Sequence, residues 1–98
     1  MATGAEGFSV REATTADHDG IVALCDHAFG PRESAAVTHL LADRGYGPGR
    51  WSVAVDGDGT VLSCATLLTH TLRYGRTPVP AAQIEFVATA RDARRRGL

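Results

Sequence analysis

Several features are missing from this sequence, and each absence excludes a class of protein. No apolar run comes near the roughly 20 residues needed to span a membrane. Residues 1–7 lack the basic region followed by an apolar run that marks a secretion signal. No internal repeat, low-complexity tract or linker divides the chain. We therefore expect a soluble cytoplasmic protein in which residues 1–98 form a single domain.

Metal-binding patterns are also missing. The two cysteines, Cys25 and Cys64, form no C-x-x-C pair, and the four histidines are scattered over different segments. Residues 56–60 begin like a calcium loop, but the glycine and the glutamate that such a loop requires are not at their positions. We expect no metal site, and we expect both thiols to be reduced and to lie in the core.

Charge is low overall and unevenly distributed. The formal net charge is −1 and 44% of the residues are hydrophobic, which is typical of a globular protein and argues against a dedicated nucleic-acid binder. Arginines nevertheless cluster near the C-terminal end, without interleaved aromatic residues that could stack on bases. This distribution suits one local anionic partner better than a nucleic acid.

The first half of the chain predicts one strand and two helices. Residues 8–11 alternate apolar with polar residues, as a strand does. Thr15 is expected to cap a helix that ends at Gly30. A second helix is expected from Glu33 to a stop at Gly45. The order continues with three further strands, so we predict an α+β fold with two helices and a mostly antiparallel sheet.

Two of these further strands are expected to form a hairpin. Residues 51–55 alternate apolar with polar or small residues, and residues 56–59 predict the turn that follows. The next strand is expected to run from Val61 to about Leu72. Its apolar centre at residues 64–68 predicts that both of its faces are covered.

The last strand is limited by two prolines. Pro78 and Pro80 have no N–H group to donate to a ladder, so the strand is expected to begin after Pro80 and to run from Gln83 to Thr89. Strict alternation would place one set of side chains on one face, namely Gln83, Glu85, Val87 and Thr89, and the other set on the opposite face, namely Ile84, Phe86 and Ala88.

A basic turn closes the chain after this strand, and its residues allow three interpretations. A solvated charged turn is the most common use of such a run. A strand that leads into a glycine turn can also direct successive backbone N–H groups, together with guanidinium groups, at a phosphate. A nucleic-acid patch is the weakest of the three interpretations, because the run Arg94-Arg95-Arg96 has no aromatic partners.

The order of the elements and the closing residues 87–98 resemble the GNAT superfamily of acetyl-CoA-dependent N-acetyltransferases. The pyrophosphate motif of that family is Gln or Arg, two residues, Gly, one residue, then Gly or Ala. Residues 94–98 match its first five positions. Residues 10–17 are similar to the first strand and the start of the first helix in the family. Residues 84–89 with the triple arginine also look like the branch that contains the enhanced-intracellular-survival acetyltransferases.

The resemblance implies a GNAT-like β-α-α-β-β-β half domain, the N-terminal portion of an acyl-CoA N-acyltransferase fold that is truncated at the pyrophosphate-binding motif. It also implies acetyl-CoA as the cofactor. The cofactor-binding residues that it implies are Val87, Ala88 and Thr89 along the pantetheine arm and Arg94, Arg95, Arg96, Gly97 and Leu98 at the pyrophosphate. A side chain at position 97 would block the close approach of a phosphate, which explains the glycine.

The chemistry that the resemblance implies is direct attack of an amine, on a small molecule or a peptide, on the acetyl thioester. The ammonium must first lose a proton, so a general base is needed. Glu85 is the candidate base, because its predicted face is that of Val87 and Thr89. An exposed strand glutamate without a catalytic role is the alternative interpretation of this residue.

A competing hypothesis belongs to a different functional class. The chain would then be a non-catalytic α+β module that forms a homo-oligomer along the exposed edge of its last strand, or docks an acidic partner through Arg94, Arg95 and Arg96. Under the first hypothesis, residues 1–98 alone are expected to have little or no acetyltransferase activity. Neither hypothesis includes a nucleic acid or a membrane as a partner.

Overall fold

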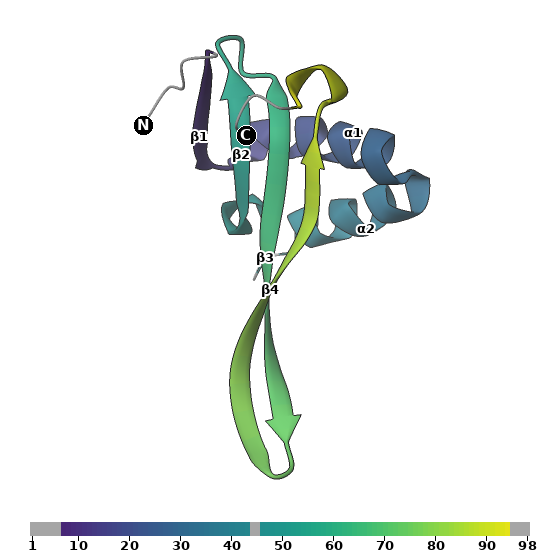
Figure 1. The fold of residues 1–98 in the computed structure, drawn as a ribbon. Coiled ribbons are helices and arrows are strands. Elements are labelled where there is room, and N and C mark those ends of the chain that lie inside the picture. Colours follow the sequence, from purple (N-terminus) through teal and green to yellow (C-terminus); the bar gives the residue numbers. More distant parts are fainter. Residues whose placement is uncertain (1–6, 44–45, 95–98) are drawn as a thin grey trace.

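The computed structural model describes residues 7–43 and 46–94 of the chain. Within these residues the elements follow the predicted order (Figure 1): β1 (Phe8–Glu12), α1 (His18–Phe29), α2 (Pro31–Ala42), β2 (Trp51–Asp56), β3 (Val61–Tyr74) and β4 (Thr77–Thr89). The strands form one antiparallel sheet in the order β1-β2-β3-β4. The predicted α+β class, with two helices and an antiparallel sheet, is confirmed.

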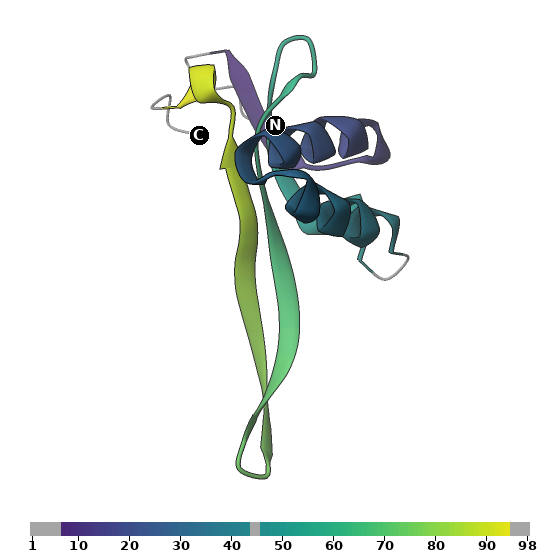
Figure 2. The same ribbon diagram turned by 90° about the vertical axis from the view of Figure 1, so that its right-hand side faces the viewer.

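Both helices pack on the same face of the sheet, which Figure 2 shows edge-on. We call this the covered face, and the opposite face the open face. The covered face receives alternate residues of β2, namely Trp51, Val53 and Val55, which alternate with Ser52 and Ala54 on the open face. The period of two in the sequence of β2 thus separates a face packed against helices from one without them.

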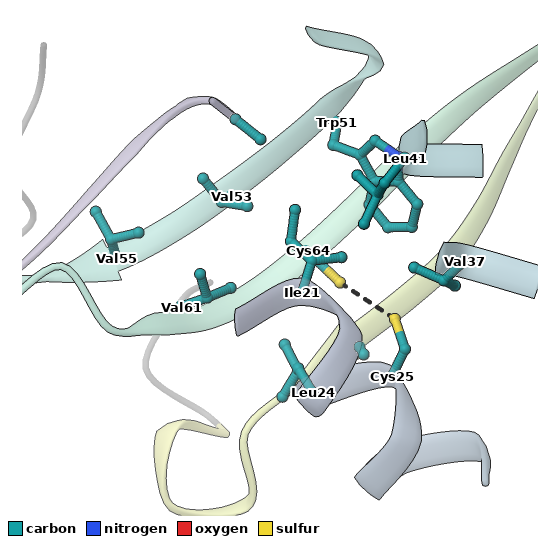
Figure 3. Close-up of a cluster of buried hydrophobic side chains, with 12 residues drawn as sticks. Ile21, Leu24, Cys25, Val37, Leu41, Trp51, Val53, Val55, Val61 and Cys64 are labelled. Atoms are coloured by element: carbon teal, nitrogen blue, oxygen red, sulfur yellow. Dashed lines mark hydrogen bonds between the residues drawn. The ribbon is translucent and has the colours of Figure 1, made fainter. Parts of the chain in front are cut away.

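The core lies between the helices and the covered face (Figure 3). Side chains from α1 and α2 meet those of β2 and β3 there, and the most deeply buried are Ile21, Cys25, Val37, Trp51 and Val53. These positions recur at helical spacing in α1 and α2 and at strand spacing in β2, so hydrophobic periodicity predicted most of the core. Cys25 and Cys64 are free thiols inside it, as expected.

The start of α1 is fixed by a partly buried ion pair between Arg11 and Asp17. Asp17 is 3% exposed, and its carboxylate accepts hydrogen bonds from the Arg11 guanidinium at 2.6 and 3.0 Å and from the Thr14 N–H at 2.8 Å. The bond from Arg11 lowers the pKa of Asp17. The prediction that Thr15 caps the helix was wrong, because a 3₁₀ turn, Thr15–Asp17, precedes α1: Thr14 caps that turn, and Asp17 is the N-cap of α1 itself.

The second helix begins two residues earlier than predicted. Pro31 occupies its first turn, where the missing proline N–H would have no helical partner in any case. The helix ends at Ala42, and Asp43 follows in an extended conformation. The predicted stop at Gly45 lies outside the described residues.

The first helix lies so close to the sheet that one position admits no side chain. A Cβ atom on Gly20 would lie 2.8 Å from Cγ2 of Val61 on β3. A contact this short forces a neighbour to move, and the β-branched valine has little freedom to do so. Gly20 therefore lowers the helix propensity of α1 but permits its close packing.

The β3–β4 hairpin extends well past the helices (Figures 1 and 2) and gives the molecule a long axis of 49 Å. We call residues 71–80 at its end the arm; all of them are exposed. The prediction that β4 begins after Pro80 was wrong, because the strand begins at Thr77 and contains both prolines. The turn between the strands is limited to Gly75 and Arg76.

The prolines are tolerated because of where they fall in the ladder. Tyr74 pairs with Thr77 across the two-residue turn, so the pair Arg73–Pro78 and the pair Thr71–Pro80 occupy the alternate, non-hydrogen-bonded positions. At these positions the nitrogen of β4 faces away from β3, and β4 is an edge strand of the described sheet. The missing N–H groups of the two prolines therefore remove no hydrogen bond between β3 and β4.

The expectation that the centre of β3 is covered on both faces was also wrong. Cys64 and Thr66 face the helices and are 2% exposed, whereas Leu67 on the open face is 42% exposed. The apolar run reflects a sheet with helices on one face only.

Candidate functional site

A β-bulge in β4 separates the residues that the sequence had placed on one face. Glu85 pairs with Thr66 and Ala88 pairs with Cys64, so Phe86 and Val87 together oppose the single residue Ala65. Thr66 and Cys64 lie on the covered face, so Glu85 and Ala88 lie there too. The prediction that Glu85 shares a face with Val87 and Thr89 was wrong, because the extra residue reverses the alternation.

The backbone at the bulge adopts a conformation that is rare for a bulky residue. Phe86 has φ of 51°, in the left-handed region that costs an L-residue about 1–2 kcal/mol. Its ring is held by two aromatic contacts, stacked on Trp51 at 6.1 Å between centroids and edge-on to Phe29 at 6.4 Å. Burial and aromatic contacts of this kind offset the local strain, so the bulge is maintained by packing.

After the bulge, β4 presents backbone groups to its free edge. The N–H of Ala90 donates to the carbonyl of Leu62 at 2.7 Å, which makes this a hydrogen-bonded pair. Antiparallel ladders alternate, so the N–H and C=O of the preceding Thr89, opposite Ser63, point away from β3. Val87 lies on the open face with its side chain 58% exposed.

The residues around Thr89 are fixed from the side of β3. The Ser63 hydroxyl donates to the Ala88 carbonyl at 3.0 Å and lies 3.1 Å from the Thr89 hydroxyl. The predicted cofactor-binding residues Val87, Ala88 and Thr89 therefore form a short, well-held edge that is open on its outer side.

The basic turn begins directly after this edge. Arg91–Ala93 form a 3₁₀ turn, and Ala93 is buried on the open face with Phe8, Ala54 and Leu62. This apolar contact fixes the path of the chain up to Arg94, which is exposed. Four predicted pyrophosphate contacts, Arg95, Arg96, Gly97 and Leu98, lie outside the described residues, and their roles stay predictions.

A hollow lies beside the bulge. A groove of about 360 Å³ is lined by residues of β4 and of the α1–α2 junction: Phe29, Glu33, Ile84, Glu85, Phe86 and Val87. Glu85 is half-buried there, and the Gln83 side-chain amide donates a hydrogen bond to its carboxylate. The groove thus combines two carboxylates with two aromatic rings, an arrangement that attracts a cationic group.

Sequence reasoning found Glu85 but missed Glu33 and Phe29. These two residues flank the junction between α1 and α2, where Gly30 has φ of 105°. That backbone angle favours glycine and turns the chain sharply between the helices. The only sequence signal for this was the Gly30-Pro31 pair, which marks a helix boundary but does not indicate what the boundary faces.

A second hollow, of about 630 Å³, lies between α1 and the basic turn. Its lining is mostly apolar, from residues such as Ala23 and Leu24, with His27, Arg91 and Asp92 at its margins. Arg91 therefore lines this hollow together with residues of α1, and Glu85 does not line it. Among residues 7–43 and 46–94, no three side chains of His, Cys, Asp or Glu are grouped as metal ligands would be, and no helix is long and apolar enough to cross a membrane.

Comparisons with known proteins identify the family. The model of the acetyltransferase (GNAT) domain matches residues 9–98. Two GCN5-related N-acetyltransferases from Kribbella flavida have similar structures, with TM-scores of 0.66 and 0.59 at 24% and 26% identity over 92% and 96% of this chain. Glucosamine-6-phosphate N-acetyltransferase from Arabidopsis thaliana has a similar structure with a TM-score of 0.66, at 19% identity over 93% of this chain. A search of curated protein sequences found no match.

The chain belongs to the GNAT acetyltransferase family, because the family match covers nearly its whole length. It spans 23%, 59% and 65% of the three structures just named, so it corresponds to less than two thirds of each. The structural likeness establishes the fold, with the predicted β-α-α-β-β-β order. Membership of a narrower branch of the family stays a prediction.

Proposed function

We propose that the natural protein transfers an acetyl group from acetyl-CoA to a primary amine by direct attack, and that residues 1–98 form the N-terminal portion of the domain that does so. The observation that carries this proposal is the end of β4. The bulge at Phe86 is followed by an open backbone edge at Thr89 and then by the basic turn. These features precede the partial pyrophosphate motif in a chain of the GNAT family.

The residues of this edge fit acetyl-CoA chemically. The outward N–H and C=O of Thr89 match the amide groups of an extended pantetheine arm, which would bind as an added strand does. The exposed side chain of Val87 offers apolar contact beside it, and Ala88 forms the backbone link between the two. Arg94 would supply positive charge for the pyrophosphate. When bound, acetyl-CoA supplies the activated acetyl thioester.

The remaining pyrophosphate contacts are assigned from the motif alone. Arg95, Arg96, Gly97 and Leu98 would present successive N–H groups to the phosphate oxygens, with guanidinium groups beside them. A Gly97→Glu substitution adds a side chain and a negative charge at this position. We expect it to abolish acetyl-CoA binding by the natural full-length protein, and unchanged affinity would argue strongly against the assignment.

The acceptor amine would enter the groove beside Glu85. A protonated amine is attracted there by the carboxylates of Glu33 and Glu85 and by the faces of the Phe29 and Phe86 rings. Glu85 would then accept the proton that the ammonium must lose before it attacks. The hydrogen bond from Gln83 orients its carboxylate. A small molecule and a peptide with a free amine both satisfy this chemistry.

Glu85→Gln in the natural full-length protein tests the catalytic role. The substitution keeps the size of the side chain but removes its basicity, so we expect acetyl transfer to fall by about 10²–10⁴-fold while acetyl-CoA affinity is retained. Release of the CoA thiol, measured with a panel of primary amines, gives the rate.

Asp19→Asn is the matched control, because it removes a carboxylate from the exposed first turn of α1, away from the groove. It should leave the rate within about twofold. A Glu85→Gln enzyme with the rate of the wild type would remove Glu85 from the mechanism without affecting the cofactor assignment.

A second candidate function is supported by the arm. Arg73 and Arg76 lie at its end beside Tyr74, which is 78% exposed, and the sequence has no carboxylate between Gly59 and Glu85. Such a surface suits an acidic partner.

Homo-oligomerisation along the β4 edge is restricted on the arm by Pro78 and Pro80, which cannot donate a backbone hydrogen bond to an added strand. Light scattering combined with acetyl-CoA titration distinguishes docking from acetyl transfer. An increase in particle mass on addition of an acidic protein, without any binding of acetyl-CoA, favours docking.

A further inference from the structure

The two cysteines of the chain face each other across the core. Cys25 on α1 is 0% exposed and Cys64 on β3 is 2% exposed, and their sulfur atoms lie 3.8 Å apart (Figure 3). Thirty-eight residues separate them in the sequence, so the fold alone brings them together. The GNAT assignment and the proposed transfer chemistry give neither thiol a role.

The pair is joined to the bulge in β4 by a chain of hydrogen bonds. The Cys64 thiol donates to the Phe86 carbonyl at 3.5 Å. A thiol carries one proton, so the contact between the sulfurs is then donated by Cys25 to Cys64. The neighbouring Cys25 sulfur and burial in the core both raise the pKa of Cys64.

We propose that Cys25 and Cys64 form a modification site, at which a small peroxide converts the two thiols into an intramolecular disulfide that joins α1 to β3. To form the bond the sulfurs must approach from 3.8 Å to about 2.05 Å. The folded core places the partner thiol next to the first oxidised sulfur, so that sulfur is captured when the core closes, before it is oxidised further.

The reaction balances with hydrogen peroxide as the oxidant. One thiolate attacks a peroxide oxygen, the O–O bond breaks, and a sulfenic acid and water form after proton transfer. The second thiolate then attacks the sulfenic sulfur, the S–S bond forms, and the S–O bond breaks to release a second water. Two electrons pass from the sulfurs to the peroxide, and each thiol gives up its proton to a water molecule.

Oxidation would alter the support of the bulge. The disulfide has no S–H proton, so the Phe86 carbonyl loses its donor at the residue where the backbone is strained. The new bond would also hold α1 against β3 at the centre of the core. Because both sulfurs are buried, the reaction must wait for transient opening of the α1 packing, so we expect it to be slow in the folded protein.

The test uses the natural full-length protein with hydrogen peroxide as the probe. After a timed exposure the peroxide is destroyed with catalase, the protein is unfolded in guanidinium with N-ethylmaleimide, and the peptides that contain Cys25 and Cys64 are weighed. We expect a linked pair of peptides that carries no maleimide and whose mass is two hydrogen atoms less than the sum of the two free peptides. After treatment with dithiothreitol the pair should separate, and both cysteines should then take maleimide. Two labelled thiols, added oxygen atoms, or a bond between two chains would overturn the proposal.

The controls are Cys25→Ala and Cys64→Ala. Each should retain one thiol that takes maleimide or gains oxygen after peroxide, without any linked peptide pair. If either variant is unfolded by circular dichroism, the linked pair in the folded wild type and its reversal by dithiothreitol still decide the question. The oxidised protein should melt several degrees above its reduced form. An equal or lower Tm would contradict the inference that the native geometry accommodates the bond.

Discussion

The two faces of the sheet differ sharply in how their side chains are packed. On the covered face Trp51 and Val53 are 0% and 1% exposed, whereas on the open face Val10 and Ile84 are 55% and 68% exposed. The same strands contribute to both faces, so the helices make the difference. Stability is therefore concentrated on the covered face, while the open face has one smaller buried cluster around Ala93 and leaves Val10 and Ile84 accessible.

Near the end of β4 the regular alternation of side chains between the covered face and the open face is interrupted. The bulge turns Glu85 towards the covered face and Val87 towards the open face within three residues. A regular strand would have kept both side chains on one side, with the proposed base beside the cofactor edge. The irregularity instead places Glu85 in a groove with α2 and leaves the Thr89 backbone free. The bulge thus gives the proposed acceptor groove and the proposed cofactor edge different faces of the strand, with Val87 at the point where they adjoin.

Trp51→Ala should have the largest effect on stability. The residue is fully buried and stacks on Phe86, so its removal should lower the free energy of unfolding by about 3–5 kcal/mol in urea denaturation. Ile84→Ala on the open face is the matched control, with an expected loss below about 1 kcal/mol. Equal losses for the two variants would show that the open face is packed as tightly as the covered one.

Asp17→Asn should have the next largest effect on stability. It should lower the free energy of unfolding by about 1.5–3 kcal/mol near neutral pH, because the buried carboxylate accepts charged hydrogen bonds from Arg11. The pKa of Asp17 is lowered by this bond, so its stabilisation is fully present above the unfolded pKa of about 4. It is lost as the pH falls through the lower folded value. Urea denaturation from pH 7 to pH 2 should therefore show the wild type and the variant converging in acid, and a constant difference would contradict this assignment.

Gly20→Ala gives a smaller effect whose sign is informative. Helix propensity alone predicts that alanine stabilises α1 by up to about 1 kcal/mol. The contact with Val61 predicts the opposite, a loss of about 1 kcal/mol, because the added Cβ would lie 2.8 Å from Cγ2. Chemical denaturation distinguishes the two, and the double variant Gly20→Ala/Val61→Ala should recover part of the loss. A more stable Gly20→Ala protein would show that α1 is not held closely against β3.

The sequence predicted the elements well because their signals are local. Alternation in β2 and helical spacing in α1 and α2 each follow from neighbours in the chain, and they located most of the covered face. The prolines of β4 were misinterpreted, because only pairing with β3 shows that Pro78 and Pro80 fall at outward positions of an edge strand. Edge status is a property of the sheet and cannot be predicted from one strand.

The candidate site was predicted less completely, for the same physical reason. Val87, Ala88 and Thr89 were found because the strand precedes a recognisable motif. The bulge could not be predicted from the sequence, because no glycine marks its position. Phe86 adopts its unusual φ because contacts with Trp51 and Phe29 hold its ring. Glu33 and Glu85 line one groove because of where the fold places α2 relative to β4, and no local pattern encodes that arrangement.

The central claim, that the free edge at Thr89 binds acetyl-CoA, is tested most directly by calorimetric titration of acetyl-CoA into Thr89→Pro and Thr89→Val variants of the natural full-length protein. The proline removes the outward N–H without removing a backbone bond to β3, whereas valine keeps that N–H; both variants lose the hydroxyl that lies 3.1 Å from the Ser63 hydroxyl, so the N–H is the difference between them. We predict that Thr89→Pro loses about tenfold or more in affinity while Thr89→Val binds as the wild type does. Equal affinity of all three proteins, with the Thr89→Pro variant folded, would contradict the account.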